Sequence, residues 1–449
     1  MKRIFSLILV VSMVAAFTAC GNQQQAATPV ETPPEDSGVT VAENNEVDIP
    51  AEGETVTVWC WDPAFNIFAM EEAAKVYQGI NPNFEIDIVE VSWDDIQTRL
   101  ITIAAANALD TLPDIFLCQD NAFQKNVINF PEIFADLTDS GIDFSQFSAG
   151  KVAYSVIDGR NFGVPFDNGV VVNAMRTDIL EQAGYTIDDF TDITWDRYIE
   201  LGESILAQTG YPIMSDRHRE TDLIMIMLQS TGASMFHADG SPNIADNDIL
   251  KDAMAIFVEL IESGVCQMVN NWDEYIASIV NSDVAGTVNG CWILGSIQTA
   301  DDQAGNWALT NLPRMNTPGA TNYSNNGGSS WAVTTNAQNP ELAISFLANT
   351  FAGSVEFYET ILPASGAIGT WIPAAASAVY SEPHLFFGGQ AVFADILAFG
   401  ANVPTNYTGV YYYEARDAVG LALSRVIDDG ISIEEALQQA EDEVLFLMQ

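Results

Sequence analysis

The sequence predicts an α/β protein built from two lobes, and three observations support this prediction. The chain has 449 residues, which exceeds the length at which a single hydrophobic core keeps growing. Hydrophobic residues make up 48% of it and charged residues 17%, the balance of a globular protein with a large core. From residue 55 onward, strand-like and helix-like hydrophobic patterns alternate along the chain.

The charge of the chain limits its partners. It has 15 Lys and Arg residues against 61 Asp and Glu residues, a formal net charge of -46 at pH 7. Nucleic acids and anionic membrane surfaces attract positively charged proteins, so we expect neither as a binding partner. Most of the acids are expected to lie on a solvated surface.

The first twenty residues have the pattern of an export signal. Lys2 and Arg3 precede an apolar run over residues 4–17, which is too short to span a membrane convincingly. The segment "AFTACGN" then resembles the lipobox of bacterial lipoproteins, and this resemblance implies that Cys20 is lipidated and starts the mature chain. The alternative for Cys20 is a thiol buried in a core.

Residues 21–53 are predicted to form a flexible linker. The segment begins "GNQQQAATPVETPPEDSG" and has no hydrophobic period. Such a composition cannot bury enough apolar surface to offset the entropy of ordering. We therefore expect the segment to be a flexible spacer that extends the reach of the main body from its anchor.

Residues 55–118 predict a parallel sheet. The segment "TVTVWCW" reads as a strand, residues 67–80 as a helix, residues 84–91 as a strand, residues 94–108 as a helix and "DIFLC" as a third strand. A strand that returns through a helix to a parallel neighbour makes a right-handed crossover. Ligands of such sheets bind beyond the carboxyl ends of the strands.

Three loops should therefore share one rim of this sheet, "WDP", "SWDD" and "QDN". Trp61 and Trp93 offer flat apolar faces there, and a set of carboxylates offers acceptors: Asp62, Asp94, Asp95 and Asp120. A sugar ring needs both, because it has C–H groups on one face and hydroxyls at its edge. The alternatives are core packing for each tryptophan and helix capping for Asp62 and Asp94.

Later segments resemble one known family. The run "GVPFDNGVVVN", a helix ending "EQAGY", then "TWDRYIEL", "VNGCWILGS", "NGGSSWAVTTNAQNPELAISFLANTF" and "YYYEARDAVGLALSRVIDDGISIEEAL" are similar to bacterial extracellular solute-binding proteins, the carbohydrate receptors of ABC importers. The resemblance implies a periplasmic-binding-protein-like fold of two α/β lobes with a hinge and an interlobe ligand cleft. It implies an N-terminal lobe of residues 54–165 and 312–362 and a C-terminal lobe of residues 166–311 and 363–449. It also implies that the chain crosses between lobes near residues 165–169, 311–313 and 361–373.

The same resemblance implies a set of ligand-binding residues where motifs match. They are Trp61, Asp62, Asp120, Asp167, Asn168, Trp292, Gly328, Ser329, Trp331 and Tyr412. Trp93 joins this set from the rim predicted above.

The segment "MSDRHRE", residues 214–220, concentrates basic residues in an acidic chain. It follows the apolar run "GYPIM", so it is expected at a strand end in the second lobe. One interpretation is a ligand-contacting loop in which Arg219 binds hydroxyls or a carboxylate. The other is a surface patch paired with neighbouring acids.

Enzyme motifs are missing from the sequence. It has no nucleophile elbow, metalloprotease helix, phosphate-binding loop or dinucleotide fingerprint. The three histidines, at positions 218, 237 and 384, lack zinc-ligand spacing, and we expect no metal and no cofactor. The cysteines of the main body show no C-x-x-C spacing, which favours buried thiols over disulfides, namely Cys60, Cys118, Cys266 and Cys291.

The sequence thus predicts a receptor and no catalytic residues. It would be a monomer tethered outside the cytoplasm by Cys20, and it would bind a saccharide or oligosaccharide by hinge closure and present it to the membrane subunits of an ABC importer. A secreted glycoside hydrolase and a carbohydrate-binding adhesin are the alternatives.

Overall fold

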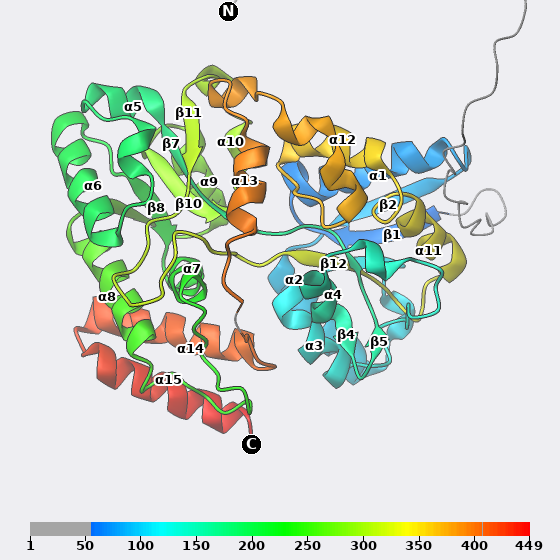
Figure 1. The fold of residues 1–449 in the computed structure, drawn as a ribbon. Coiled ribbons are helices and arrows are strands. Elements are labelled where there is room, and N and C mark those ends of the chain that lie inside the picture. Colours follow the sequence, from blue (N-terminus) through cyan, green and yellow to red (C-terminus); the bar gives the residue numbers. More distant parts are fainter. Residues whose placement is uncertain (1–54, 406) are drawn as a thin grey trace, which may run out of the picture. The chain divides into compact units, whose positions relative to one another are not determined.

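The computed structural model describes residues 55–405 and 407–449 (Figure 1). The predicted signal peptide, Cys20 and the predicted linker lie outside the described residues. Among the residues described, no helix is both long and apolar enough to cross a bilayer.

The first sheet has five strands in the order β2-β1-β3-β12-β6. These are β1 (Thr55–Cys60), β2 (Glu85–Glu90), β3 (Ile115–Gln119), β6 (Val164–Pro165) and β12 (Ser329–Val333). Strands β1, β2 and β3 are parallel, which confirms the predicted alternation over residues 55–118. Strand β12 comes from far along the chain and runs antiparallel to both β3 and β6.

Alternate side chains of this sheet enter two cores, one on each face. On β1, Val56 and Val58 pack into a core with α1, α11 and α12, whereas Trp59 packs into another with α2 and α3. This sheet and its helices form the first lobe. The helices are α1 (Phe68–Gln78), α2 (Trp93–Ala106), α3 (Asp120–Asn129), α4 (Ala149–Val152), α11 (Pro340–Asn349) and α12 (Val355–Ser365), and β4 (Val156–Ile157) pairs with β5 (Arg160–Asn161) nearby.

The second sheet has the order β10-β7-β11 and is antiparallel. Its strands are β7 (Val171–Arg176), β10 (Gly286–Gly290) and β11 (Trp307–Thr310), and a parallel pair is formed by β8 (Met214–Arg217) and β9 (Cys266–Val269). On β7, Val171 and Met175 enter one core, while Val172 and Ala174 enter another. A second lobe is therefore built on the same plan.

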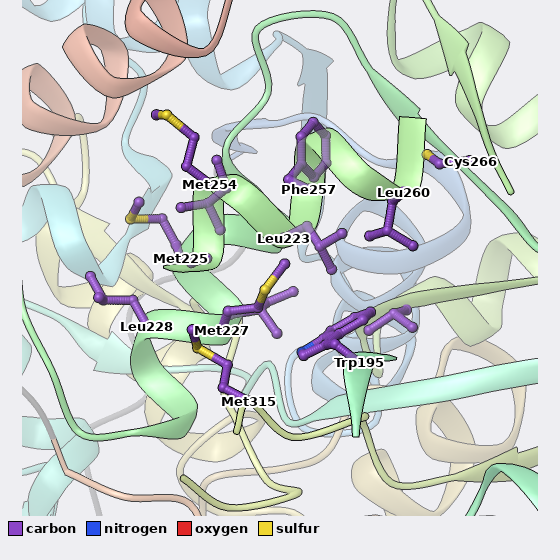
Figure 2. Packing of buried hydrophobic residues seen from close by; sticks show 14 of the residues in the cluster. Trp195, Leu223, Met225, Met227, Leu228, Met254, Phe257, Leu260, Cys266 and Met315 are labelled. Carbon is purple, nitrogen blue, oxygen red and sulfur yellow. The ribbon is translucent and has the colours of Figure 1, made fainter. Parts of the chain in front are cut away.

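Nine helices among the described residues belong to this second lobe. They are α5 (Thr177–Gln182), α6 (Trp195–Thr209), α7 (Asp222–Ser230), α8 (Asp248–Glu262), α9 (Trp272–Val280), α10 (Ile293–Ile297), α13 (Val392–Gly400), α14 (Tyr412–Ser424) and α15 (Ile433–Leu447). Figure 2 shows part of the larger core, in which Met225, Met227 and Leu228 of α7 lie among buried side chains from other elements. Helix α7 is apolar on most of its surface because it is buried on most sides.

Two chain segments connect the elements of the two lobes. Residues 166–170 lead from β6 to β7, and residues 311–328 lead back from β11 to β12. The first of these segments pairs through isolated bridges, Asp167 with Gly369 and Val170 with Asn325. Two of the predicted crossings, near residues 165–169 and 311–313, fall in these segments. The third predicted crossing and the predicted lobe boundaries stay predictions.

Candidate functional site

One pocket collects side chains from both lobes. Its empty space is about 590 Å³ when the opening to solvent is included. The first lobe contributes Asp120 at the start of α3 and Tyr154. The second contributes α7 through Met225 and Leu228, and α14 through Tyr412. Residues 325–327, which lead into β12, complete this part of the wall.

Behind the pocket, Asp120 belongs to a buried ion pair. Lys151 Nζ contacts Asp120 Oδ2 and donates a hydrogen bond to the Ser329 carbonyl oxygen at 2.8 Å. Ser330 Oγ donates to Asp120 Oδ1 at 3.0 Å. The Lys151 and Asp120 side chains are only 5% and 3% exposed, so losing one partner would leave a buried charge. Burial raises the pKa of Asp120, and Lys151 opposes that rise.

Asp167 and Gly328 lie next to the ion pair of Asp120 and Lys151. Asp167 Oδ1 accepts a hydrogen bond from the Ser329 amide at 2.8 Å, and the Asp120 amide donates to the Gly328 carbonyl at 3.0 Å. Burial raises the pKa of Asp167 to about 6, partly offset by Lys151. Gly328 has a φ of +138°, and a Cβ there would lie 2.8 Å from Asp120 Oδ2. Glycine therefore lets the chain pass close to the ion pair.

A second group of charges lies at the start of α7 and on α14. We call Arg217, Glu220, Asp222 and Arg416 the charge network. Arg217 lies 2.7 Å from Glu220 and 3.3 Å from Asp222, and Arg416 contacts Glu220 and lies 2.8 Å from Asp222. Burial works to raise the pKa of Glu220, but Arg416 and Arg217 outweigh it and hold the pKa below its usual value. Both guanidinium groups are therefore neutralised by carboxylates.

Aromatic rings surround these polar groups. The Trp61 and Trp93 ring centroids lie 5.8 Å apart, and Trp93 lies 6.2 Å from Tyr413 on α14. In the second lobe, Trp272 and Trp292 lie 5.5 Å apart. All these tryptophans are half-buried, so each keeps part of its ring surface accessible. Ring faces of this kind can pack on the C–H face of a sugar.

The first turn of α14 also contacts the first lobe directly. Tyr413 Oη donates a hydrogen bond to Gln119 Oε1, and Glu414 forms an ion pair with Lys125 on α3. Because these contacts join an element of each lobe, they hold the lobes together on this side of the pocket.

Two buried polar atoms, one on the pocket wall and one in the aromatic group beside Tyr413, have no hydrogen-bond partner among the described residues. They are Asn325 Oδ1, from a pocket-lining residue, and Trp93 Nε1. An unpaired buried acceptor or donor costs free energy, and a ligand hydroxyl can satisfy either one. Asn325 Oδ1 is therefore a candidate for a ligand contact in this pocket.

Several sequence-predicted site residues are brought together. Asp120 and Tyr412 line the pocket, and Asp167, Gly328 and Ser329 lie directly around the Asp120 ion pair. Asn168 is next to this group, because its Oδ1 accepts a hydrogen bond from Asn325 at 2.6 Å. Trp61, Trp93 and Trp292 belong to the aromatic groups described above, and none of them is among the residues that line the pocket.

Two other predicted site residues, Trp331 and Arg219, do not line the pocket. Trp331 is fully buried between the rings of Phe166 and Phe351, so its side chain packs in the first lobe's core and does not line the pocket. Arg219 is exposed and has a φ of 64°. Its ligand contact stays a prediction, while Arg217 from the same loop joins the charge network.

Asp62 and Asp94, two of the acids predicted at the rim of the sheet, have different positions. Asp62 accepts a hydrogen bond from the Ala64 amide at 2.9 Å and caps the helical turn Pro63–Ile67, as the alternative interpretation expected. Asp94 is exposed, and its expected capping role is wrong, because Ser92 caps α2 by accepting from the Asp95 amide. A serine two residues after the strand was the overlooked capping signal.

Sequence reasoning missed Lys151 and most of the charge network. Lys151 lies in "SAGKVAY", which has no distinctive pattern, and its partner Asp120 is 31 residues away. Glu220 and Asp222 do lie in or beside the segment "MSDRHRE" that composition singled out. The available signal was the scarcity of basic residues, since each buried one needs an acid nearby.

Asp216, beside the charge network, gives a testable pH dependence. It is buried, and burial raises its pKa to about 8, with Glu220 and Asp222 adding to the rise. A folded-state pKa above the unfolded value means that stability falls as pH rises from about 4 to about 8. Asp216→Asn should therefore be more stable than wild type at pH 8 by on the order of 5 kcal/mol, with the gap closing toward pH 4.

Urea unfolding of both proteins at several pH values measures this gap. Asp239→Asn is the control, because Asp239 is exposed and its hydrogen bonds with Ser241 lower its pKa. A gap for Asp216→Asn that stays constant from pH 4 to pH 8 would contradict the prediction.

Comparisons with known proteins agree with the geometry. A family model described as bacterial extracellular solute-binding protein matches residues 72–386. A lactose-binding protein of Rhizobium radiobacter is 39% identical over 388 residues, covering 86% of this chain and 92% of the relative. An arabinooligosaccharide-binding protein of Halalkalibacterium halodurans is 21% identical over 305 residues, covering 66% of this chain and 67% of the relative.

Solved structures share the fold. An ABC transporter associated binding protein from B. animalis subsp. lactis, solved with β-1,6-galactobiose, has a TM-score of 0.76 and 19% identity, covering 88% of this chain and 98% of that one. A receptor of Streptomyces glaucescens, solved with and without acarbose, has a TM-score of 0.75 and 16% identity, covering 89% and 99%. Both likenesses support the two-lobe α/β architecture.

Proposed function

Because the chain belongs to the family of bacterial extracellular solute-binding proteins, we propose that it is a receptor that binds a saccharide between its lobes and delivers it to an ABC importer. The observation that carries the proposal is the pocket, to which both lobes contribute. A ligand that touches both lobes stabilises the closed arrangement, and an importer can recognise that arrangement. No covalent chemistry is involved.

The chemistry of the pocket supports a saccharide. Its wall combines a carboxylate and amides with the ring of Tyr412 and the apolar side chains of α7. A disaccharide with a β-galactose unit is the first ligand to test, because the relative at 39% identity is a lactose-binding protein. Family membership places the chain outside the cytoplasm, and we propose that Cys20 tethers it as a monomer to the membrane by a lipid.

A ligand screen tests this function. We expect a sugar panel that includes lactose to contain a compound that raises the melting temperature of the purified protein. At a free concentration of about 100 times the Kd, the ligand should add about 2.7 kcal/mol to the free energy of unfolding. No shift with any sugar, together with binding of amino acids or peptides, would overturn the ligand class. Turnover of a chromogenic glycoside would favour the hydrolase alternative.

Tyr412→Ala tests the position of the site. Loss of a pocket-lining ring should weaken saccharide binding by about tenfold to a hundredfold in calorimetry, the range of an aromatic anchor residue. Tyr411→Ala is the matched control, because Tyr411 packs against the second lobe's core without lining the pocket. Equal losses in both variants would move the site elsewhere.

A further inference from the structure

The charge network borders the pocket. Asp222, Met225 and Gln229 follow each other at helical spacing on one face of α7, and the latter two line the pocket. Arg416 lies one helical turn after Tyr412 on α14. The network therefore lies at the end of two helical faces that form the pocket wall.

A polar side chain also joins the network to the wall. Asn326 lines the pocket and hydrogen-bonds to Asp222 as well as to Asn289, whose Oδ1 accepts from Asn326 Nδ2 at 2.9 Å. A ligand that contacts Asn326 would therefore be separated from the Asp222 carboxylate by this one side chain.

Both arginines of the network are fully engaged with partners of this chain. Each guanidinium contacts Glu220 and Asp222, and the Arg217 and Arg416 side chains are only 21% and 19% exposed. Arg416 Nε also donates to Thr221 Oγ1 at 3.1 Å. Arg217 lies 5.2 Å from the Trp272 ring centroid. Neither positive charge is available to a ligand in this arrangement.

The rest of the pocket adds no free positive charge. Asp120 is the one charged residue among the described residues that line it. Lys151, the nearest cation behind that carboxylate, is buried in its ion pair. A ligand carboxylate would therefore lose its hydration beside Asp120 without gaining a cationic partner, which is unfavourable.

We propose that Glu220 and Asp222 are specificity-determining residues, which hold Arg217 and Arg416 in ion pairs and so make the receptor select uncharged saccharides over saccharides that carry a carboxylate. The inference rests on the proposed saccharide function and deepens it. It also opposes the interpretation in which the basic segment 214–220 binds a carboxylate of the ligand. The same two arginines, once released, are the groups that bind carboxylates best, because a guanidinium matches a carboxylate with two parallel hydrogen bonds.

The test compares a matched ligand pair by calorimetry. One member is a neutral disaccharide that binds in the screen, and the other carries a carboxylate in place of its terminal C6 hydroxymethyl group. Wild type should bind the neutral member at least about a hundredfold more tightly, the scale of an unpaired buried charge. Glu220→Gln removes one carboxylate from both arginines, and it should narrow this preference by about tenfold or more.

Control variants keep the test decisive. Glu200→Gln makes the same chemical change at an exposed surface pair with Arg197, and it should leave the preference unchanged. Retained binding of the neutral ligand shows that Glu220→Gln is folded, and Asp222→Asn is the second variant if it is not.

Failure of the inference and failure of the function give different results. Equal binding of both ligands by wild type, or an unchanged preference in Glu220→Gln and in Asp222→Asn, overturns the inference while the saccharide function stands. Binding of neither ligand, nor of any sugar in the screen, overturns the proposed function and the inference with it.

Discussion

Asp120→Ala is expected to lower the free energy of unfolding by about 3–5 kcal/mol, the cost of leaving one member of a buried ion pair without its partner. Lys151 would keep its hydrogen bond to the Ser329 carbonyl but lose the carboxylate, and its side chain has almost no access to water. Ser330 Oγ would lose its acceptor as well. Urea unfolding at neutral pH measures the loss.

The double variant Asp120→Ala with Lys151→Met separates the ion pair from simple loss of packing. Removing both charges abolishes the unpaired buried ammonium group, so the double variant should be more stable than the single one. The coupling between the two sites should reach about 2 kcal/mol or more. Additive losses, or a cost below about 1 kcal/mol for Asp120→Ala, would show that Lys151 reaches water and that the pair does not hold the site.

Gly328→Ala is expected to be a strongly damaging substitution beside the pocket. The new Cβ would lie 2.8 Å from both Asp120 Oδ2 and the Asp167 carbonyl oxygen, and 2.9 Å from Lys151 Nζ. Two of these three atoms belong to the ion pair, so the methyl group would force the pair apart or shift the chain. Together with the positive φ, this should cost about 3 kcal/mol or more.

The neighbouring Gly327 provides a matched control. Gly327 also has a positive φ, of 79°, but nothing lies within 4 Å of a Cβ built there. Gly327→Ala should therefore cost only the backbone strain, about 1–2 kcal/mol. Urea unfolding of both variants isolates the steric part, and equal losses would mean that the Asp120 and Lys151 side chains move aside freely.

The first half of the first lobe could be predicted because its signals are local. Strand β1 alternates its faces, and helices α1 and α2 follow it at regular spacing. Each of these signals lies within a few residues of the element that it predicts. Such elements need no knowledge of the rest of the fold.

The charged site could not be predicted in the same way, because its partners meet only in the folded chain. Arg416 and Glu220 are 196 residues apart, and Lys151 and Ser329 are 178 apart. The positive φ at Arg219 is likewise invisible in the sequence, and it turns Arg219 outward while Arg217 stays inside. Trp331 shows the same limit, since a strand residue beside a glycine turn can face either the core or a ligand.

The position of β12 between β3 and β6 sets an order of events when the protein folds. The chain is synthesised from its N-terminus, so β3 is made while one of its edges is unpaired. Its partner β12 follows only after roughly 200 further residues, so this lobe depends on very non-local pairing. Until then, the unpaired edge of β3 can pair with strands of other chains. The first lobe therefore cannot complete its sheet until about three quarters of the polypeptide has been made.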